Sequence, residues 1–147
     1  MSTDGDQALA DTLVDELAER AWAVRKTPLP RMLEVDEALS TAAASGWRRF
    51  GPVTLVDADD IVGAGAPGGN TRIVQALCAQ DRGLEALVPV HDPAAFALAW
   101  AANVGDELQL VLRGTPGYAQ PEVPLTVKVG AKADTELGKR VRLDVGS

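Results

Sequence analysis

The sequence contains few of the residues on which many functional sites depend. Among its 147 residues there are one cysteine, one histidine, three Trp, two Phe and one Tyr. The single Cys78 excludes an internal disulfide, so a reducing cytoplasm is the expected compartment. One histidine and one cysteine cannot supply a zinc site, which draws several ligands from these two residue types. We therefore expect no metal or other cofactor to be bound by this chain alone.

Basic residues are also scarce, with fourteen Lys and Arg against twenty-one Asp and Glu and a net charge of −7. This balance argues against nucleic acid or an anionic membrane surface as a partner. No apolar run approaches the ~20 residues of a membrane span, and the acidic start Met1–Asp6 lacks the order of a signal peptide. The length suits one domain. We predict a flexible tail at residues 1–6 and a single α/β domain over residues 7–147.

Two helices are predicted near the N-terminus. From Gln7 to about Arg25, apolar residues recur at helical spacing, with acids early and bases late, as the helix dipole favours. Prolines 28 and 30 end this helix. Asp36 can then cap a shorter helix that runs to about Ser45, where Gly46 stops it.

The middle of the chain predicts a strand–helix–strand–helix order. Val53–Val56 is a short β-rich run, and Leu84–Val90 is a second one. A helix is predicted between them from Arg72 to Gln80, with Cys78 on its buried face as an inert thiol. Asp92 and Pro93 together mark the start of another helix, which ends at Gly105. A right-handed crossover would make the two strands parallel.

The last third changes to the two-residue period of half-buried strands. Apolar residues alternate with polar ones over residues 108–112, 125–129 and 141–145. The loops between these runs are expected at Gly114–Pro124 and Gly130–Gly138. The predicted fold is therefore α/β with a mixed sheet. It has a βαβα core with parallel strands, then three antiparallel strands, with the N-terminal helices packed on the sheet.

One edge of this sheet is the predicted binding site. In open α/β sheets, ligands bind beyond the carboxyl ends of the parallel strands. An acidic, glycine-rich loop follows the first strand, and a histidine and an aspartate follow the second. No constellation for nucleophilic catalysis is visible, so no catalytic residue is predicted. The candidate binding residues are Asp57, Asp60, Gly63, Gly65, Pro67, Gly68, Asn70, Thr71, His91 and Asp92.

The chemistry of that site leaves several ligands open. The glycines and the following helix start could hold a phosphate or carboxylate. Asp57, Asp59 and Asp60 would repel a bare anion, so a ligand bearing a cation or a substrate amide is equally open. A tight connection with solvated acids is the structural alternative. The loop is not a P-loop, and its match to the dinucleotide-binding glycine spacing is weak evidence.

The same stretch resembles the C-terminal domain of the microcystinase C family of metallopeptidases, which act on linearised microcystin and related peptides. A second matching stretch is His91-Asp92-Pro93, where the family tends to have Trp-Asp-Pro. The resemblance covers roughly residues 10–130. In the loop, the residues that fall on the family pattern are Asp57, Asp60, Gly63, Gly65, Ala66, Pro67, Gly68 and Thr71.

The chain departs from that pattern at Ile61, Val62, Ala64 and Gly69, where the family has Asn, Pro, Gly and Asp. The resemblance implies that the zinc ligands belong to a longer N-terminal domain with no counterpart in this sequence. It therefore implies a stand-alone or excised non-catalytic half that contributes a glycine-rich cleft loop, with zinc present only if a separate metal-binding domain completes it. The partner would be that domain or further copies of the chain. A small-molecule (anion or peptide) binding module and a structural or oligomerisation domain are the alternatives.

Overall fold

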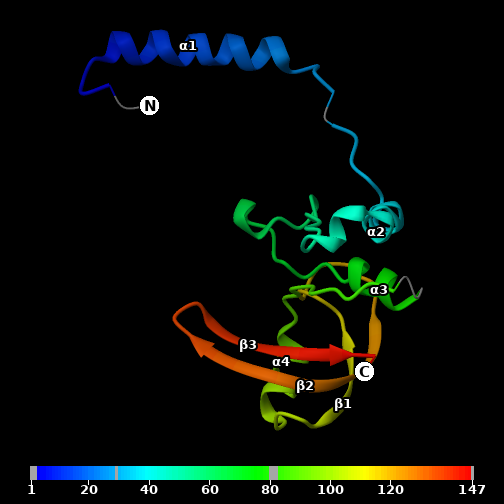
Figure 1. The fold of residues 1–147 in the computed structure, drawn as a ribbon. Helices are drawn as coiled ribbons and strands as arrows, with labels where there is room; N and C mark the ends of the chain where they lie inside the picture. The colour runs from blue at the N-terminus through cyan, green and yellow to red at the C-terminus, as the bar shows by residue number, and fades with distance from the viewer. Residues whose placement is uncertain (1–2, 29, 80–82, 147) are drawn as a thin grey trace. The chain divides into compact units, whose positions relative to one another are not determined.

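The computed structural model describes residues 3–28, 30–79 and 83–146. The chain divides into two compact units, Met1–Met32 and Leu33–Ser147 (Figure 1). The described residues form four α-helices, two short 3-10 helices and one three-stranded antiparallel sheet. None of these helices combines the length and apolar character needed to cross a membrane.

The described part of the first unit contains one regular element, helix α1 (Gln7–Val24), which confirms the predicted N-terminal helix. Its N-cap is Asp6, whose carboxylate accepts a hydrogen bond from the Leu9 N–H at 2.9 Å. The Asp6 N–H donates to the Thr3 carbonyl at 3.0 Å, so residues 3–6 form a turn that leads into the helix. Met1 and Ser2, the rest of the predicted tail, lie outside the described residues.

The sheet in the second unit confirms the three alternating strands. Strands β1 (Glu107–Leu112), β2 (Val123–Thr135) and β3 (Gly138–Val145) pair antiparallel in the order β1-β2-β3. The predicted loop at Gly130–Gly138 is too long, because β2 continues to Thr135 before a tight turn. Pairing with β3 shifts register at Gly130, where a Cβ would clash with the Asp144 carboxylate.

Helix α4 (Pro93–Ala101) contacts β1 and β3 and covers the core. The side chains of Phe96 and Trp100 on this helix are only half-buried, and their stacked rings have centroids 5.5 Å apart. Ala95 and Ala99 are buried instead, because small side chains let the helix lie close to the strands. The core cluster consists of Ala95, Leu110, Leu112, Val123, Leu125 and Val127.

The remaining helices pair with each other. Helix α2 (Val35–Ala44) buries Leu39 and Ala42 and contacts α3 (Arg72–Ala79). The prediction of a buried Cys78 is wrong, since this thiol is exposed. Every residue of α3 is exposed or half-buried, so its apolar face is not fully covered by other parts of the structure.

The predicted parallel βαβα core is not formed. Neither Val53–Val56 nor Leu84–Val90 is a strand or a helix. Within the described part of the chain, their backbone groups make no backbone–backbone hydrogen bond. Their apolar side chains are exposed or only half-buried. Val56 is 75% and Leu87 88% exposed, whereas Leu84, Val88 and Val90 are half-buried. A strand needs a paired neighbour and cover on its apolar faces. Among the described residues, these segments have no paired neighbour and only partial cover.

Candidate functional site

The glycine-rich loop Asp57–Thr71, called the glycine loop below, is held by its own acidic side chains. The Asp60 carboxylate accepts hydrogen bonds from the Gly68 and Asn70 backbone N–H groups, both at 2.7 Å. The Asp57 carboxylate accepts from the Asn70 side-chain amide at 2.5 Å and from the Asp59 N–H at 3.1 Å. These two predicted binding residues therefore fix the shape of the loop from within.

The end of the glycine loop also starts helix α3. The Asn70 side-chain oxygen accepts a hydrogen bond from the Arg72 N–H at 3.1 Å. Asn70 is thus bonded on its amide nitrogen, its amide oxygen and its backbone N–H. A side chain with these contacts connects the acids to the helix, so its principal role in the structure is to hold the loop in place.

A second loop, residues 113–122 and called the proline loop below, lies directly against the glycine loop. A Cβ placed on Gly69 would clash with the Thr115 backbone nitrogen and hydroxyl. A Cβ placed on Gly114 would clash with the Gly69 carbonyl. Gly114 also has a φ of +70°, which side-chain-bearing residues rarely adopt. The two loops touch backbone to backbone, and this approach requires glycine on both sides.

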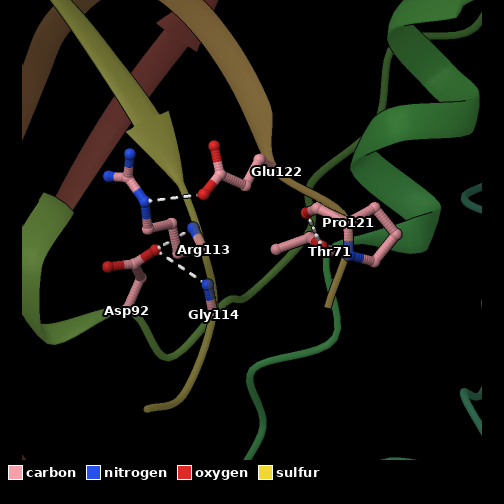
Figure 2. A network of polar contacts seen from close by, with 6 residues as sticks. All are labelled: Thr71, Asp92, Arg113, Gly114, Pro121 and Glu122. Carbon is pink, nitrogen blue, oxygen red and sulfur yellow. Dashed lines mark hydrogen bonds and ion pairs between the residues drawn. The ribbon is translucent and has the colours of Figure 1, made fainter. Parts of the chain in front are cut away.

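Two buried polar side chains lock the proline loop in position (Figure 2). Thr71, which has no exposed surface, donates its hydroxyl to the Pro121 carbonyl at 2.6 Å. Asp92 caps helix α4 by accepting from the Ala95 N–H at 2.9 Å. Its other oxygen accepts from the Arg113 and Gly114 N–H groups at 2.6 and 2.9 Å. Both predicted site residues are therefore tied to the protein itself.

The ionisation of Asp92 follows from these contacts. Burial by itself would raise the pKa of the Asp92 carboxyl. The hydrogen bonds from the backbone N–H groups of Ala95, Arg113 and Gly114 together outweigh that burial and hold the pKa below its usual value. The carboxylate is the form that can accept all three bonds, so it is the charged form that stabilises this junction.

His91 lies beside the glycine loop, although the parallel strands that were expected to bring it there are absent. Its backbone N–H donates to the Gly68 carbonyl at 2.6 Å. Its Nδ1 lies 3.0 Å from the Thr115 hydroxyl, so the imidazole also touches the proline loop. The ring is exposed and remains accessible to a ligand.

Two surface hollows adjoin these loops. The larger, about 320 Å³, lies between the start of helix α4 and the proline loop. The smaller, about 120 Å³, lies between the glycine loop and the proline loop. Tyr118 and Gln120 line both hollows, so the two hollows are adjacent. The Gln120 side-chain oxygen is buried and has no hydrogen-bond partner within the part of the chain that the structure describes.

The predicted site residues therefore differ in what they can offer a ligand. Thr71 and Asp92 are buried, and Asp57, Asp60 and Asn70 are engaged inside the loop. The other predicted residues are exposed or half-buried, and their side chains form no hydrogen bond inside the glycine loop. They are Gly63, Gly65, Pro67, Gly68 and His91.

The sequence interpretation missed the proline loop as part of the site. Its residues Arg113, Tyr118 and Gln120 line the hollows, and Thr115 contacts His91. Two glycines and three prolines within Gly114–Pro124 were a usable signal, because such a composition indicates a fixed, non-repetitive path.

The region is rich in carboxylates, which are common metal ligands. Among residues 3–28, 30–79 and 83–146, however, no group of three or more His, Cys, Asp or Glu side chains is arranged to hold a metal ion. The described residues of this chain therefore do not fit a zinc site by themselves.

Comparison with known proteins places this architecture in a family. Residues 55–146, which contain the glycine loop, α4 and the whole sheet, match the protein family described as MlrC C-terminus. Microcystinase C from Sphingomonas sp is 31% identical over 130 residues, a match that covers 86% of this chain. The chain spans about a quarter (24%) of the length of that relative. No solved structure matches. From the match over most of its length, the chain belongs to the MlrC C-terminus family.

Proposed function

We propose that this chain is the non-metal half of a peptidase-type assembly, in which a separate metal-binding domain docks on its second unit. The glycine loop then forms one wall of a substrate cleft, and the chain alone is not catalytic. Zinc, where present, is held by the docked domain. Cys78 and the absence of other cysteines make the cytoplasm the compartment that this proposal favours.

The observation that carries the proposal is the state of Val53–Val56 and Leu84–Val90. Both have the composition of buried strands, yet Val53–Val56 and Leu87 are exposed, and Leu84, Val88 and Val90 are only half-buried. Neither segment makes a backbone–backbone hydrogen bond among the described residues. Backbone N–H and C=O groups and apolar side chains of this kind are stabilised by pairing and burial. We infer that the docked domain supplies both and thereby completes the βαβα core.

The glycine loop is well suited to be a cleft wall because its shape does not depend on a ligand. Hydrogen bonds to the Asp60 and Asp57 carboxylates hold the loop in shape. The close contact between Gly69 and Gly114 fixes it against the proline loop. A loop that is already ordered loses little conformational entropy when a substrate binds. The two hollows that share Tyr118 offer room beside it for side chains of an extended peptide.

Docking is tested with the part of Sphingomonas microcystinase C that lies outside the match, expressed separately and mixed with this chain. We expect a complex by size-exclusion chromatography. Hydrogen–deuterium exchange should show new protection at residues 53–56 and 84–90. A complex that leaves both segments as exchangeable as before would contradict the proposed surface, and the absence of any complex would contradict the proposed partner.

The matched variants are Leu87→Asp and Leu137→Asp. Leu87 lies in the proposed interface, whereas Leu137 lies in the β2–β3 turn, and the two side chains are similarly exposed at 88% and 90%. Leu87→Asp should weaken docking by roughly tenfold or more, since a charge would be buried without a partner. Leu137→Asp should leave docking unchanged. Equal effects of the two would indicate non-specific association.

Catalysis is tested with linearised microcystin, the substrate that the resemblance implies. The chain alone, with and without added zinc, should leave the peptide intact by mass spectrometry. Hydrolysis that requires both the chain and the metal-binding part supports the assembly. Hydrolysis by the chain alone would overturn the non-catalytic role.

The hollows support a second candidate function, a small-molecule or peptide binding module that works without a partner. The Gln120 side-chain oxygen, which has no partner among the described residues, could accept a hydrogen bond from a ligand after a small loop shift. A thermal-shift screen of short peptides, phosphates and dicarboxylates separates this from the first proposal, since binding to the native state must raise its stability. The absence of any stabilisation at millimolar ligand would reject it.

A further inference from the structure

Strand β3 forms an open edge of the sheet. The strand order is β1-β2-β3, so β3 has a strand neighbour on one side only (Figure 1). Apart from this pairing with β2, residues 139–145 form no backbone–backbone hydrogen bond within the part of the chain that the structure describes. An edge of this kind offers its free N–H and C=O groups to a strand of another chain. The side chains of β3 indicate which strand fits.

These side chains separate into an apolar row and a charged row. Leu143 packs against the core cluster, and Val141 and Val145 lie on the same face because side chains alternate along a strand. This row is incompletely covered, since Val141 and Leu143 are half-buried and Val145 is 48% exposed. Arg142 and Asp144 lie on the opposite face, where they form an ion pair at 3.0 Å. The edge therefore combines apolar surface with charges of both signs.

We propose that β3 pairs antiparallel with β3 of a second copy of this chain, with Leu143 opposite Leu143 of the second copy on the two-fold axis. Val141 then lies opposite Val145 of the second copy on the core side. Arg142 lies opposite Asp144 of the second copy on the outer side, and the two-fold axis repeats this contact. The two sheets join into one continuous sheet, and each apolar row gains a neighbour.

The charges select this register. Residues directly opposite in a symmetric antiparallel pair lie on the same face of the sheet, so the two-fold axis passes through one residue and its copy. Arg142 on the axis would set two arginines against each other, and Asp144 on the axis would set two carboxylates against each other. Val141 on the axis would place Arg140 opposite Arg142. With Leu143 on the axis, the opposed charges attract at both contacts.

The ion pair within one chain is compatible with these contacts. The Arg142 and Asp144 side chains are 60% and 41% exposed, so both are accessible from outside the chain. A guanidinium has five N–H donors and a carboxylate accepts several bonds, so each group can keep its own neighbour and also meet the second copy. By contrast, the strand at the other edge, β1, has one charged residue, Glu107, and therefore no opposite charge to match itself.

Disulfide trapping tests the register in the full chain, with Cys78→Ser as background because Cys78 is exposed. Leu143→Cys places two thiols opposite each other with Cα atoms about 5 Å apart, which a disulfide can bridge. Val141→Cys, also at a half-buried position, places them about 13 Å apart along the strands, beyond that reach. We expect oxidation to link Leu143→Cys and to leave Val141→Cys unlinked. Linking of both variants to the same extent, or of neither, would contradict the register.

Mixing two charge variants separates the contact between chains from the ion pair within one chain. Asp144→Arg and Arg142→Asp each break the internal pair and set like charges opposite each other in a homodimer. Each should weaken dimerisation roughly tenfold in sedimentation experiments at low salt. Mixed together, they place arginine opposite aspartate at both contacts, so a heterodimer should form. A mixture that dimerises no better than either variant, or a wild-type chain that stays monomeric up to millimolar concentration, would overturn the proposal.

Asp134→Arg is the matched control for these charge changes. Asp134 is an exposed acid of β2 that also forms an ion pair within the chain, with Lys139 at 3.6 Å, but it lies outside the proposed contact. Its replacement should change dimerisation by less than about twofold. An effect as large as that of Asp144→Arg, at equal sheet content by circular dichroism, would assign the loss to general charge and contradict the pairing of β3.

Discussion

Two regions of the chain are rich in β-prone apolar residues but differ in secondary structure. The first region is residues 93–145, and the second region is residues 51–91. In the first region, three strands pair in register and α4 covers one face. In the second, the two segments with strand composition are irregular, exposed or half-buried, and without strand pairing. Apolar composition alone therefore does not produce a strand in this chain.

The difference lies in what each region has nearby. The strands of the first region follow one another through the proline loop and a tight turn, with no helix between them, so each finds an antiparallel neighbour at low entropic cost. The two segments of the second region need a parallel crossover and cover on both faces. The glycine loop is ordered nevertheless, because its stability comes from the side-chain hydrogen bonds of Asp57 and Asp60.

The largest effect is expected in the core of the first region. Leu125→Ala on β2 removes a buried side chain, 9% exposed, from the cluster under α4. We expect a loss of about 3 kcal/mol in the free energy of unfolding, measured by urea denaturation. A loss below about 1 kcal/mol would mean that the sheet is as loosely packed as the second region.

Asp92→Ala removes the carboxylate that ties the start of α4 to the proline loop. It leaves the Ala95, Arg113 and Gly114 N–H groups without their acceptor, and we expect a cost of roughly 2–3 kcal/mol. Asp59→Ala, which removes an exposed acid of the glycine loop, is the matched control and should change stability by less than about 0.5 kcal/mol. Equal effects would contradict the anchoring role of Asp92.

The same carboxylate predicts an acid dependence of stability. The pKa of Asp92 is lowered in the folded state, so its stabilisation is complete above the pKa of the unfolded chain, near about 3.9. That stabilisation is lost as the pH falls from about 5 through the lowered folded pKa. Urea midpoints measured from about pH 6 to pH 2 should fall over this range. The fall should be smaller in Asp92→Asn, and an identical fall would assign the effect to other acids.

Gly69→Ala tests the contact between the two loops. A Cβ at this position clashes with the Thr115 backbone, so the proline loop must shift, at a cost of about 2 kcal/mol. Gly63→Ala in the same loop meets no atom within 4 Å and should be neutral or slightly stabilising. Amide exchange at Gly114 and Thr115 reports the shift directly. Equal stability of the two variants would contradict a close backbone contact between the loops.

The smallest effect is expected in the second region itself. Leu87→Ala should change the stability of the isolated chain by less than about 0.5 kcal/mol, because its side chain is 88% exposed. Leu87→Ala and Leu125→Ala together compare an exposed leucine with a buried one, each from a β-prone segment. A loss above about 1 kcal/mol at Leu87 would show that this segment is packed in solution and would weaken the proposed docking surface.

Much of the local structure could be predicted from residue patterns. Alternation around Leu110, Val127 and Leu143 gave the three strands, and the Asp92-Pro93 pair gave the start of α4. The exposed Cys78 and the buried Ala95 were not predicted. The apolar pattern of a helix shows which residues share a face. Which face is buried depends on where the neighbouring element lies.

For the site, residue patterns were enough to show that acids and glycines gather at one loop and that His91 and Asp92 belong near it. Three-dimensional packing was needed to show that Asp57 and Asp60 point inward, that Asp92 is buried, and that the proline loop completes the site. Hydrogen-bond direction and burial depend on contacts between distant segments, and no local pattern encodes those contacts. Likewise, Val53–Val56 carries strand propensity in its sequence, but only a neighbour can make it a strand.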